Sequence, residues 1–421
     1  MQKGNNYFNK ISGNLDFKTY DLLLTSVNSA LFDYSDHLVA NRIRPKLSFK
    51  GLLAKYIFLY SYIIGYFTPL SKDKSLVISN AYVNVFQSNY NEILPPWTYS
   101  RRKRSLLSWS ILKIIRRLNK HIESKSVKAL LSDNFINLIY SYQSELSRLF
   151  SLNKVKALIV PNDLSFFENL SISIAKRNGI PTFVYLHGLP ARYNNLDDNR
   201  ADYLIVWGKG LKEIYVKSGV PAEKILTLKH NNYSSFTNLE LRSNLENVLV
   251  LTKGISGTPC ISSQLVLPNR STILYYTELV KENLIRLGVK KATLRLHPSE
   301  SPEFYKKNLT DDFFTIDTLA KDESLAKASL VVGPTSTMVL DALKMHRNYI
   351  LFDPVFDGLT LEGMPLVSPF TGDSFIKLSN SFEEILYNIN NPGENISYDK
   401  LNDFLLVDIK DEEKFLTIIK K

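Results

Sequence analysis

The chain has 421 residues, 44% of them hydrophobic, and a mean hydropathy of −0.10. This length exceeds one ordinary hydrophobic core, and this composition excludes a disordered chain, so we expect two folded domains. The formal net charge of +11 favours an anionic partner or surface. The single cysteine, Cys260, excludes an intramolecular disulfide and is typical of a reducing cytoplasm.

The first 70 residues are expected to be rich in helix, with candidates at 20–32 and 52–67. Residues 1–18 are polar and predict no signal peptide. The apolar run 56–70 contains four tyrosines and is shorter than a bilayer span, so it predicts a buried helix. We therefore expect a cytoplasmic protein that would reach lipid as a peripheral protein of the inner membrane.

A strand is predicted at 75–79, followed by a polar, aromatic loop at 80–91. Segment 101–120 then combines apolar residues at helical spacing with the basic residues Arg101, Arg102, Lys103, Arg104, Lys113, Arg116, Arg117 and Lys120. Two interpretations stay open: a solvated face over a core stripe, or contact with an anionic membrane. The segment lacks a recognisable nucleic-acid motif or interleaved aromatic residues, so no nucleic-acid partner is expected.

After a helical pattern at 127–152, strands alternate with helices. The strands are predicted at 156–163, 182–186, 203–207 and 224–228, and the helices between them at 168–178 and 209–218. Such alternation indicates parallel βαβ units. We place a first Rossmann-like domain at 1–235, with acceptor-binding and catalytic roles.

Three strand ends of this first domain carry groups suited to catalysis. Asp163, with Glu168 one helical turn further on, is a candidate acid or base, although Asp163 would equally suit an N-cap. His187, with Gly188 and Arg192, would favour a substrate carboxylate. The last strand ends at His230-Asn231-Asn232, beside the expected domain boundary.

A polar linker at 234–247 leads to a second unit, which we place at 245–421. Its first strand, Val248–Leu251, precedes a Gly- and hydroxyl-rich loop that contains Lys253 and Gly254. A helix is predicted at 272–287, and further strands at 292–296, 313–316, 348–352 and 375–378. The second strand delivers Arg295 and His297 to its carboxyl end, which is the ligand edge of an open α/β sheet.

Residues 329–343 predict a buried strand, a Gly-Pro turn, three hydroxyl residues and a helix that begins at Thr335 or Ser336. The first turn of such a helix suits a phosphate, because its N–H groups and hydroxyls can donate hydrogen bonds. Ordinary helix capping explains the same residues. A second phosphate-compatible strand end at His297 favours the phosphate site.

Together, Arg295-Leu-His-Pro298 and Gly333-Pro-Thr-Ser-Thr337 resemble the His-Pro and Ser/Thr motif pair of bacterial glycosyltransferases that use CMP-activated sugars. These enzymes are sialyltransferases and Kdo (3-deoxy-manno-octulosonic acid) transferases of capsule and lipopolysaccharide assembly. The resemblance covers about the last two-thirds of the chain. It implies the α/β GT-B fold, in which two Rossmann-like domains with parallel sheets face a central cleft, here after a helix-rich N-terminal segment.

The resemblance implies that His297, Ser336 and Thr337 hold the donor phosphate. Arg295 and Lys253 would add positive charge, Gly254 would allow close backbone approach, and no metal is obligatory. Retaining β-Kdo transferases of this kind use an aspartate nucleophile in a region that we match to Asn232. An amide cannot replace a carboxylate nucleophile. Three explanations stay open: the match is wrong, the enzyme inverts and uses Asp163 as base, or Asn232 is an engineered Asp→Asn change.

The favoured hypothesis is a retaining transferase that moves Kdo from CMP-β-Kdo to a lipid-linked O-antigen or capsule acceptor, with the changed residue at 232. The alternatives are a sialyltransferase that uses CMP-sialic acid, a teichoic-acid-type polymerase that uses CDP-glycerol, and a catalytically inactive glycan-binding module. An anionic-surface binder that works through 101–120 alone is a further alternative.

Overall fold

The computed structural model describes the chain between residues 70 and 420, with gaps. The described residues are 70–71, 74–80, 90–98, 104–123, 127–130, 132–163, 165–190, 200–253, 270–298, 300, 302–309, 311–354 and 366–420. Outside them lie the predicted helices at 20–32 and 52–67, most of the loop at 80–91, and Arg101, Arg102, Lys103, Arg192, Gly254 and Cys260.

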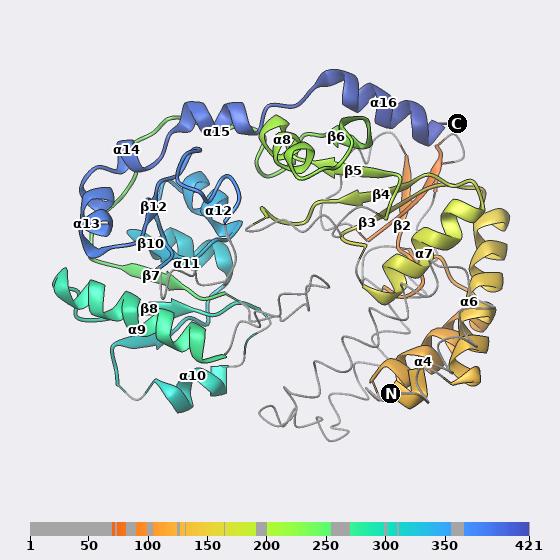
Figure 1. Cartoon of the computed structure of the whole chain (residues 1–421), viewed down its shortest axis with the longest axis horizontal. Helices are drawn as coiled ribbons and strands as arrows, with labels where there is room; N and C mark the ends of the chain where they lie inside the picture. Colours follow the sequence, from red (N-terminus) through yellow and green to blue (C-terminus); the bar gives the residue numbers. More distant parts are fainter. Residues whose placement is uncertain are drawn as a thin grey trace.

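Two six-stranded parallel sheets organise the described residues (Figure 1). The first has the strand order β2-β1-β3-β4-β5-β6. Its strands are β1 (Leu76–Ser79), β2 (Asn91–Ile93), β3 (Val155–Val160), β4 (Thr182–Tyr185), β5 (Tyr203–Val206) and β6 (Ile225–Thr227). Its helices are α4 (Trp109–Glu123), α5 (Val127–Leu130), α6 (Asp133–Leu152), α7 (Phe166–Arg177), α8 (Lys209–Lys217) and the short 3₁₀ helix η1 (Ala222–Lys224).

The second sheet has the strand order β12-β11-β10-β7-β8-β9. Its strands are β7 (Val248–Leu251), β8 (Ala292–Arg295), β9 (Phe314–Ile316), β10 (Leu330–Gly333), β11 (Tyr349–Phe352) and β12 (Leu378–Ser379). The helices that follow β7 along the chain are α9 (Arg270–Arg286), α10 (Pro302–Asn308), α11 (Lys321–Lys327), α12 (Met338–Lys344), α13 (Phe382–Asn390), α14 (Pro392–Asn395), α15 (Tyr398–Phe404) and α16 (Ile409–Lys420). The predicted fold class, two Rossmann-like domains with parallel sheets, is confirmed.

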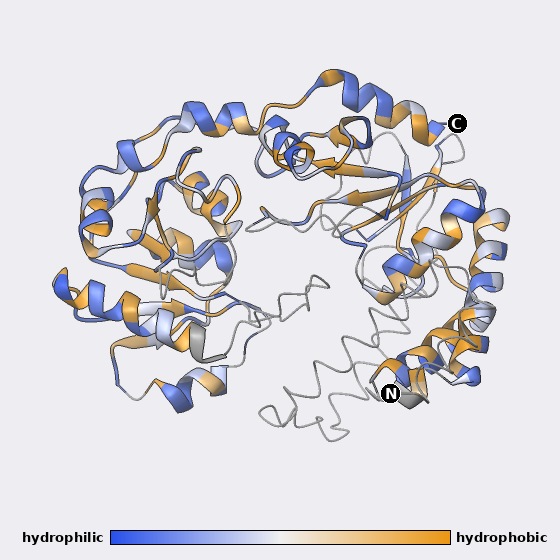
Figure 2. Cartoon of the chain, viewed as in Figure 1, coloured by the Kyte–Doolittle hydropathy of each residue, from blue (hydrophilic) through white to orange (hydrophobic). Residues whose placement is uncertain are grey.

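The cores follow from the composition of the strands. β4, β7, β10 and β11 are buried along their whole length, as expected of apolar, β-branched-rich runs in parallel sheets. Figure 2 shows the apolar residues concentrated on the strands of both sheets. None of the described helices combines the length and apolar character needed to cross a bilayer.

The end of the chain returns from the second sheet to the first (Figure 1). Asp411 on α16 accepts hydrogen bonds from the backbone N–H and the hydroxyl of Thr227, both at 2.9 Å. Phe415 packs edge-on against Phe183 at a centroid distance of 5.1 Å. The sequence-based division at 235 and 245 assigns α16 to the second domain, whereas these contacts attach it to the first sheet.

Several elements differ from the sequence-based expectation, and helices α10, α11 and α13 to α16 were not predicted. β2 lies at the end of the predicted loop 80–91, and the predicted strand at 375–378 is reduced to Leu378–Ser379. The predicted helix 127–152 is divided, because the Ser132 hydroxyl caps a new helix by accepting from the Phe135 N–H at 3.3 Å. α12 begins at Met338, later than the predicted Thr335 or Ser336.

Candidate functional site

The strand order of the second sheet defines where a ligand would bind. Read from β9, the order is 3-2-1-4-5-6 in the numbering of that domain, so its topological switch point lies between β7 and β10. These strands pair with Val250 opposite Val332. Lys253 follows β7 and Thr335 follows β10, and the Lys253 Nζ donates a hydrogen bond of 2.5 Å to the Thr335 Oγ1. A lysine and a hydroxyl therefore meet at the expected ligand edge.

The turn after β10 needs a glycine for reasons of space. A Cβ on Gly333 would lie 2.4 Å from the Tyr349 hydroxyl and 3.1 Å from the Leu251 Cβ. The buried Tyr349 hydroxyl donates to the Pro334 carbonyl at 2.6 Å, which fixes the turn before Thr335. Burial also raises the pKa of Tyr349, so the phenol stays protonated and remains a donor. This contact explains the glycine of the motif.

His297 is positioned by a carboxylate that sequence reasoning did not select. The backbone N–H of His297 donates to Glu300 at 2.8 Å and to the Thr252 Oγ1 at 3.0 Å. The Tyr305 hydroxyl donates to the other oxygen of Glu300 at 2.6 Å, and the Thr252 hydroxyl also donates to Glu300. The chain after β8 is thus fixed on both sides of His297.

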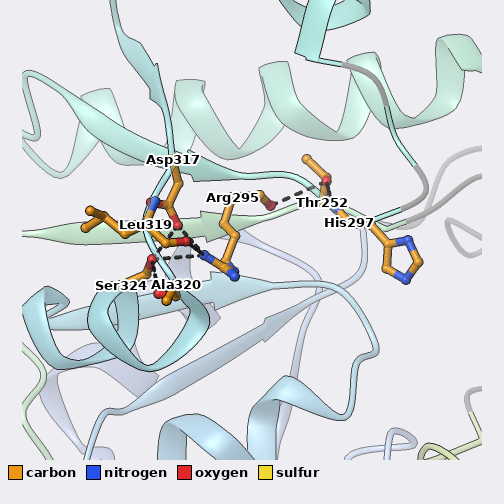
Figure 3. Close-up of polar contacts among 7 residues, drawn as sticks. All are labelled: Thr252, Arg295, His297, Asp317, Leu319, Ala320 and Ser324. Carbon is orange, nitrogen blue, oxygen red and sulfur yellow. Dashed lines mark hydrogen bonds and ion pairs between the residues drawn. The ribbon is translucent and has the colours of Figure 1, made fainter. Parts of the chain in front are cut away.

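The His297 imidazole is exposed and points away from the contacts between Arg295 and Asp317 (Figure 3). Partial desolvation lowers its pKa, the Glu300 carboxylate opposes this shift, and the Lys253 ammonium adds to it. The influence of Lys253 on His297 indicates that the ammonium and the imidazole act on the same region. At neutral pH the ring is neutral and can still donate one N–H hydrogen bond.

Arg295 has a different role from the predicted one. Its guanidinium donates to Asp317 at 2.6 Å, to the Leu319 carbonyl at 3.1 Å and to the Ser324 hydroxyl at 2.9 Å. Figure 3 shows these partners to the left of Arg295 and the His297 ring apart from them, to the right. Arg295 therefore joins β8 to the start of α11, and the predicted phosphate contact is corrected to a structural ion pair.

Thr337 connects the two domains. Its Oγ1 accepts a hydrogen bond of 2.8 Å from the backbone N–H of Leu189, in the loop after β4. A Cβ on Gly188 would lie 3.0 Å from the same oxygen, so the loop approaches Thr337 closely. The Ser336 Oγ accepts from the Met338 N–H at 3.2 Å, which is a local turn contact. Both hydroxyls keep a proton that can be donated to a ligand.

His187 follows the end of β4, where the strand end was predicted, and is exposed. Its Nδ1 is 3.1 Å from the Pro161 carbonyl. Because a carbonyl only accepts, this nitrogen carries the proton, and a neutral ring would present Nε2 as an acceptor. Arg192, predicted beside it, lies outside the described residues.

His230 is packed among aromatic rings. It stacks on Tyr233 at a centroid distance of 4.4 Å and contacts Trp207 at 4.5 Å. Its Nδ1 accepts from the Asn232 N–H at 3.1 Å. Burial, with a smaller contribution from Lys344, lowers its pKa to about 4, so the ring is neutral at pH 7. His230 organises the turn that carries Asn232.

Asn232 is exposed at the domain boundary, and its side-chain amide makes no hydrogen bond to a described residue. The Lys344 Nζ donates to the backbone carbonyl of Asn232 at 3.1 Å. The adjacent Tyr233 hydroxyl donates to Asp341 at 3.0 Å, and Lys321 pairs with the same carboxylate at 2.8 Å. Asp341 thus ties α12 of the second domain to the chain that presents Asn232.

In the first sheet, the order 2-1-3-4-5-6 places the switch point between β1 and β3. Asn80 follows β1, and both predicted carboxylates follow β3. Asp163 is fully buried: it accepts from the Arg200 N–H at 2.6 Å and pairs with its guanidinium at 3.7 Å. This environment favours a structural role in holding residue 200. The N-cap position of α7 belongs to Ser165, so the capping interpretation also fails.

Glu168 is the more suitable carboxylate at this point. One of its oxygens accepts from the Asn80 side chain and from the Trp97 indole N–H, both at 3.0 Å. Its second oxygen has no hydrogen-bond donor among the described residues. Trp97 also stacks on Phe167 at 6.1 Å. Glu168 is therefore a fixed carboxylate with one oxygen left for a ligand.

The sequence analysis did not select Thr252, Glu300 or Trp97, and it gave Thr335 no role of its own. Thr252 directly follows β7, and Thr335 follows β10 by two residues. The strand order would have selected both, but the order of strands is not visible in the sequence. Glu300 stands three residues after His297, which is a spacing that many turns share. Trp97 gave no signal, because it contacts Glu168 across 71 residues.

The chain matches no protein-family model and no curated protein. Among solved structures it is similar to UDP-N-acetylglucosamine 2-epimerase from Rickettsia bellii, with a TM-score of 0.45, 12% identity, and coverage of 82% of this chain and 96% of that one. It is also similar to MurG from Acinetobacter baumannii, with a TM-score of 0.42, 8% identity, and coverage of 82% of this chain and 99% of that one. For the wall teichoic acid polymerase TagF, the TM-score is 0.40 and the identity 12%, with coverage of 87% of this chain and 95% of that one. These likenesses are too distant to assign a function.

The topology defines the class of this protein. Two Rossmann-like domains meet through loops at the carboxyl ends of their strands, as the contact between Thr337 and Leu189 shows, and the chain end returns to the first domain. This is the GT-B arrangement.

Proposed function

We propose that this protein is a glycosyltransferase that moves Kdo from CMP-Kdo to a growing surface glycan. The observation that carries the proposal is the group formed by Lys253, His297 and Thr335 at the switch point of the second sheet. Thr337, two residues after Thr335, accepts a hydrogen bond from Leu189 in the loop 187–189 of the first domain. The choice of a cytidine nucleotide and of Kdo rests on the resemblance of the His-Pro and Ser/Thr motifs.

The transfer breaks the bond between the anomeric carbon of the sugar and a phosphate oxygen, and the bonding electrons leave with CMP. Negative charge then develops on the phosphate. The Lys253 ammonium and the hydroxyls of Ser336 and Thr337 would stabilise it. His297 donates a further hydrogen bond, and a bound phosphate dianion would raise its pKa and favour the imidazolium.

The acceptor would bind over the first sheet. In an inverting transfer, the free oxygen of Glu168 is the better base, since Asp163 is enclosed by Arg200. A retaining transfer needs a carboxylate at 232, where this chain has an amide. Asn232 is exposed at the domain boundary, and this position supports a retaining transfer only when Asn232→Asp supplies the carboxylate.

A lipid-linked acceptor would bring the enzyme to the cytoplasmic face of the inner membrane. The net charge of +11 supports such a location, since that surface is anionic. The partners proposed here are thus a CMP-sugar, a glycan acceptor and an anionic lipid surface.

Donor hydrolysis and transfer to isolated surface glycans test the proposal. The parent and Asn232→Asp are each given CMP-Kdo, CMP-sialic acid, CDP-glycerol and UDP-N-acetylglucosamine. We expect CMP-Kdo alone to be consumed, and Asn232→Asp to be faster than the parent if the enzyme retains configuration. Exclusive use of another donor would refute the Kdo assignment. Loss of activity in Glu168→Gln, with Asn232→Asp no faster than the parent, would favour the inverting route.

A further inference from the structure

Helix α4 has one face fixed in the core and one face open to solvent. Ile111, Ile115 and Leu118 are buried at 0%, 7% and 0% exposure, at the spacing of a single helical stripe. The start of the helix is fixed as well, because the Ser108 Oγ accepts from the Ile111 N–H at 3.1 Å. The apolar stripe is therefore already used for packing against the first domain. Any partner must bind the opposite face.

The opposite face is cationic. Lys113, Arg116, Arg117 and Lys120 are exposed and recur at spacings of three and four residues. Arg116, Arg117 and Lys120 form no ion pair with any described residue. From Lys113 to Lys120 the stripe extends about 10 Å, at 1.5 Å per residue. A cationic stripe with no ion-pair partner for Arg116, Arg117 or Lys120 among the described residues fits an anionic partner.

The same stripe begins with a large apolar ring. Trp109 is 73% exposed, more than any other exposed large hydrophobic side chain in the described residues. The Lys113 ammonium lies 5.9 Å from the centre of its ring. Indole combines an apolar ring with one N–H donor and favours the boundary between lipid headgroups and acyl chains. A nucleic acid would use the cations, but a single terminal ring offers no stacking platform for successive bases.

We propose that the exposed face of α4, formed by Trp109, Lys113, Arg116, Arg117 and Lys120, binds the surface of an anionic phospholipid bilayer. The cations contact the headgroups, and the indole inserts at the interface. The helix keeps its apolar stripe in the protein core, so it lies on the membrane without unfolding. This proposal rests on the surface of α4 alone and is independent of donor chemistry.

Vesicle binding tests the surface. The full chain is sedimented with vesicles of phosphatidylglycerol and phosphatidylcholine, and with pure phosphatidylcholine, at 0.1 M and 0.5 M salt. Each cation near an anionic surface changes the partition coefficient about fivefold. We expect Arg116→Gln/Arg117→Gln to lower binding to anionic vesicles about 25-fold, and Trp109→Ala to lower it as well. Both effects should diminish in high salt or on neutral lipid.

Matched variants distinguish binding by this face of α4 from a general effect of losing positive charge or an exposed apolar side chain. Lys306→Gln/Lys307→Gln removes the same charge from exposed positions of α10, and Ile409→Ala removes an apolar side chain that is 72% exposed. Neither should change vesicle binding more than twofold. Equal loss in the α10 variant, retention of binding in both α4 variants, or binding to RNA but not to vesicles would each overturn the proposal. CMP binding, measured in the same variants, should be unchanged and reports separately on the proposed function.

Discussion

Burial of His230 makes the stability of the first domain depend on pH in a definite direction. The packed, neutral ring has a pKa of about 4, against 6.5 for an ordinary histidine. Between these values the unfolded chain binds more protons than the folded one, so acid favours unfolding. The stabilisation from the neutral ring is complete above pH 6.5 and is lost as the pH falls toward 4. The whole shift corresponds to about 3 kcal/mol, and the loss between pH 8 and pH 5 to about 2 kcal/mol.

The comparison of the parent with His230→Phe isolates this effect. Phenylalanine keeps the ring packed between Trp207 and Tyr233 but cannot take up a proton. It also removes the acceptor for the Asn232 N–H, so the variant is expected to be less stable at every pH, and only the difference in pH dependence is relevant. Urea unfolding from pH 8 to pH 5, followed by tryptophan fluorescence, should show about 2 kcal/mol less acid destabilisation in the variant.

Two results would refute this reasoning. One is an identical pH dependence of unfolding in the parent and in His230→Phe. The other is a His230 ring that titrates near pH 6.5 in the folded protein, as followed by NMR. Either result would mean that water reaches the ring and that the aromatic packing around it does not exclude charge.

Two further predictions concern the end of the chain and the support of His297. Gly208→Ala should destabilise the protein by about 1–3 kcal/mol in urea unfolding, because a Cβ there would lie 2.5 Å from the Leu405 Cα. Gly393→Ala is the control, since nothing lies within 4 Å of a Cβ at that position. Equal effects of the two substitutions would show that the returning chain is not tightly packed against Gly208. Glu300→Gln should lower the pKa of His297 further, since the carboxylate opposes the shift caused by desolvation; an unchanged NMR titration of His297 would show that the carboxylate does not act on the ring.

Much of the fold could be predicted from the sequence, because the pattern of residues within each of several strands is enough to identify the strand. Runs such as Val248–Leu251 and Leu330–Gly333 are apolar, buried and bounded by turn residues, and both are strands. β2 was missed because Asn91-Glu-Ile93 has no such pattern and owes its conformation to pairing with β1. The return of α16 was missed for the same reason, since Asp411 finds Thr227 across 184 residues.

The candidate site could be predicted only in part from the sequence. His297, Lys253 and Thr337 lie at strand ends, and the rule that ligands bind at this edge selected them correctly as neighbours of the sheet edge. The fate of each side chain depends on partners that are remote in sequence. Arg295 meets Asp317, and Asp163 meets Arg200, so two groups selected for chemistry are engaged in ion pairs within their own domains. Spacing along the chain identifies the strand end but not the partner.

Calorimetric binding of CMP to the parent and to His297→Ala tests the central claim most directly, with UMP as the nucleotide control and His121→Ala, on α4, as the protein control. Loss of one charge-assisted hydrogen bond should weaken CMP binding about 10- to 150-fold in His297→Ala. His121→Ala should bind CMP as the parent does, and UMP should bind more weakly than CMP. A parent that does not bind CMP, or a His297→Ala variant that binds it equally well, would contradict the assignment of the second domain as the donor site.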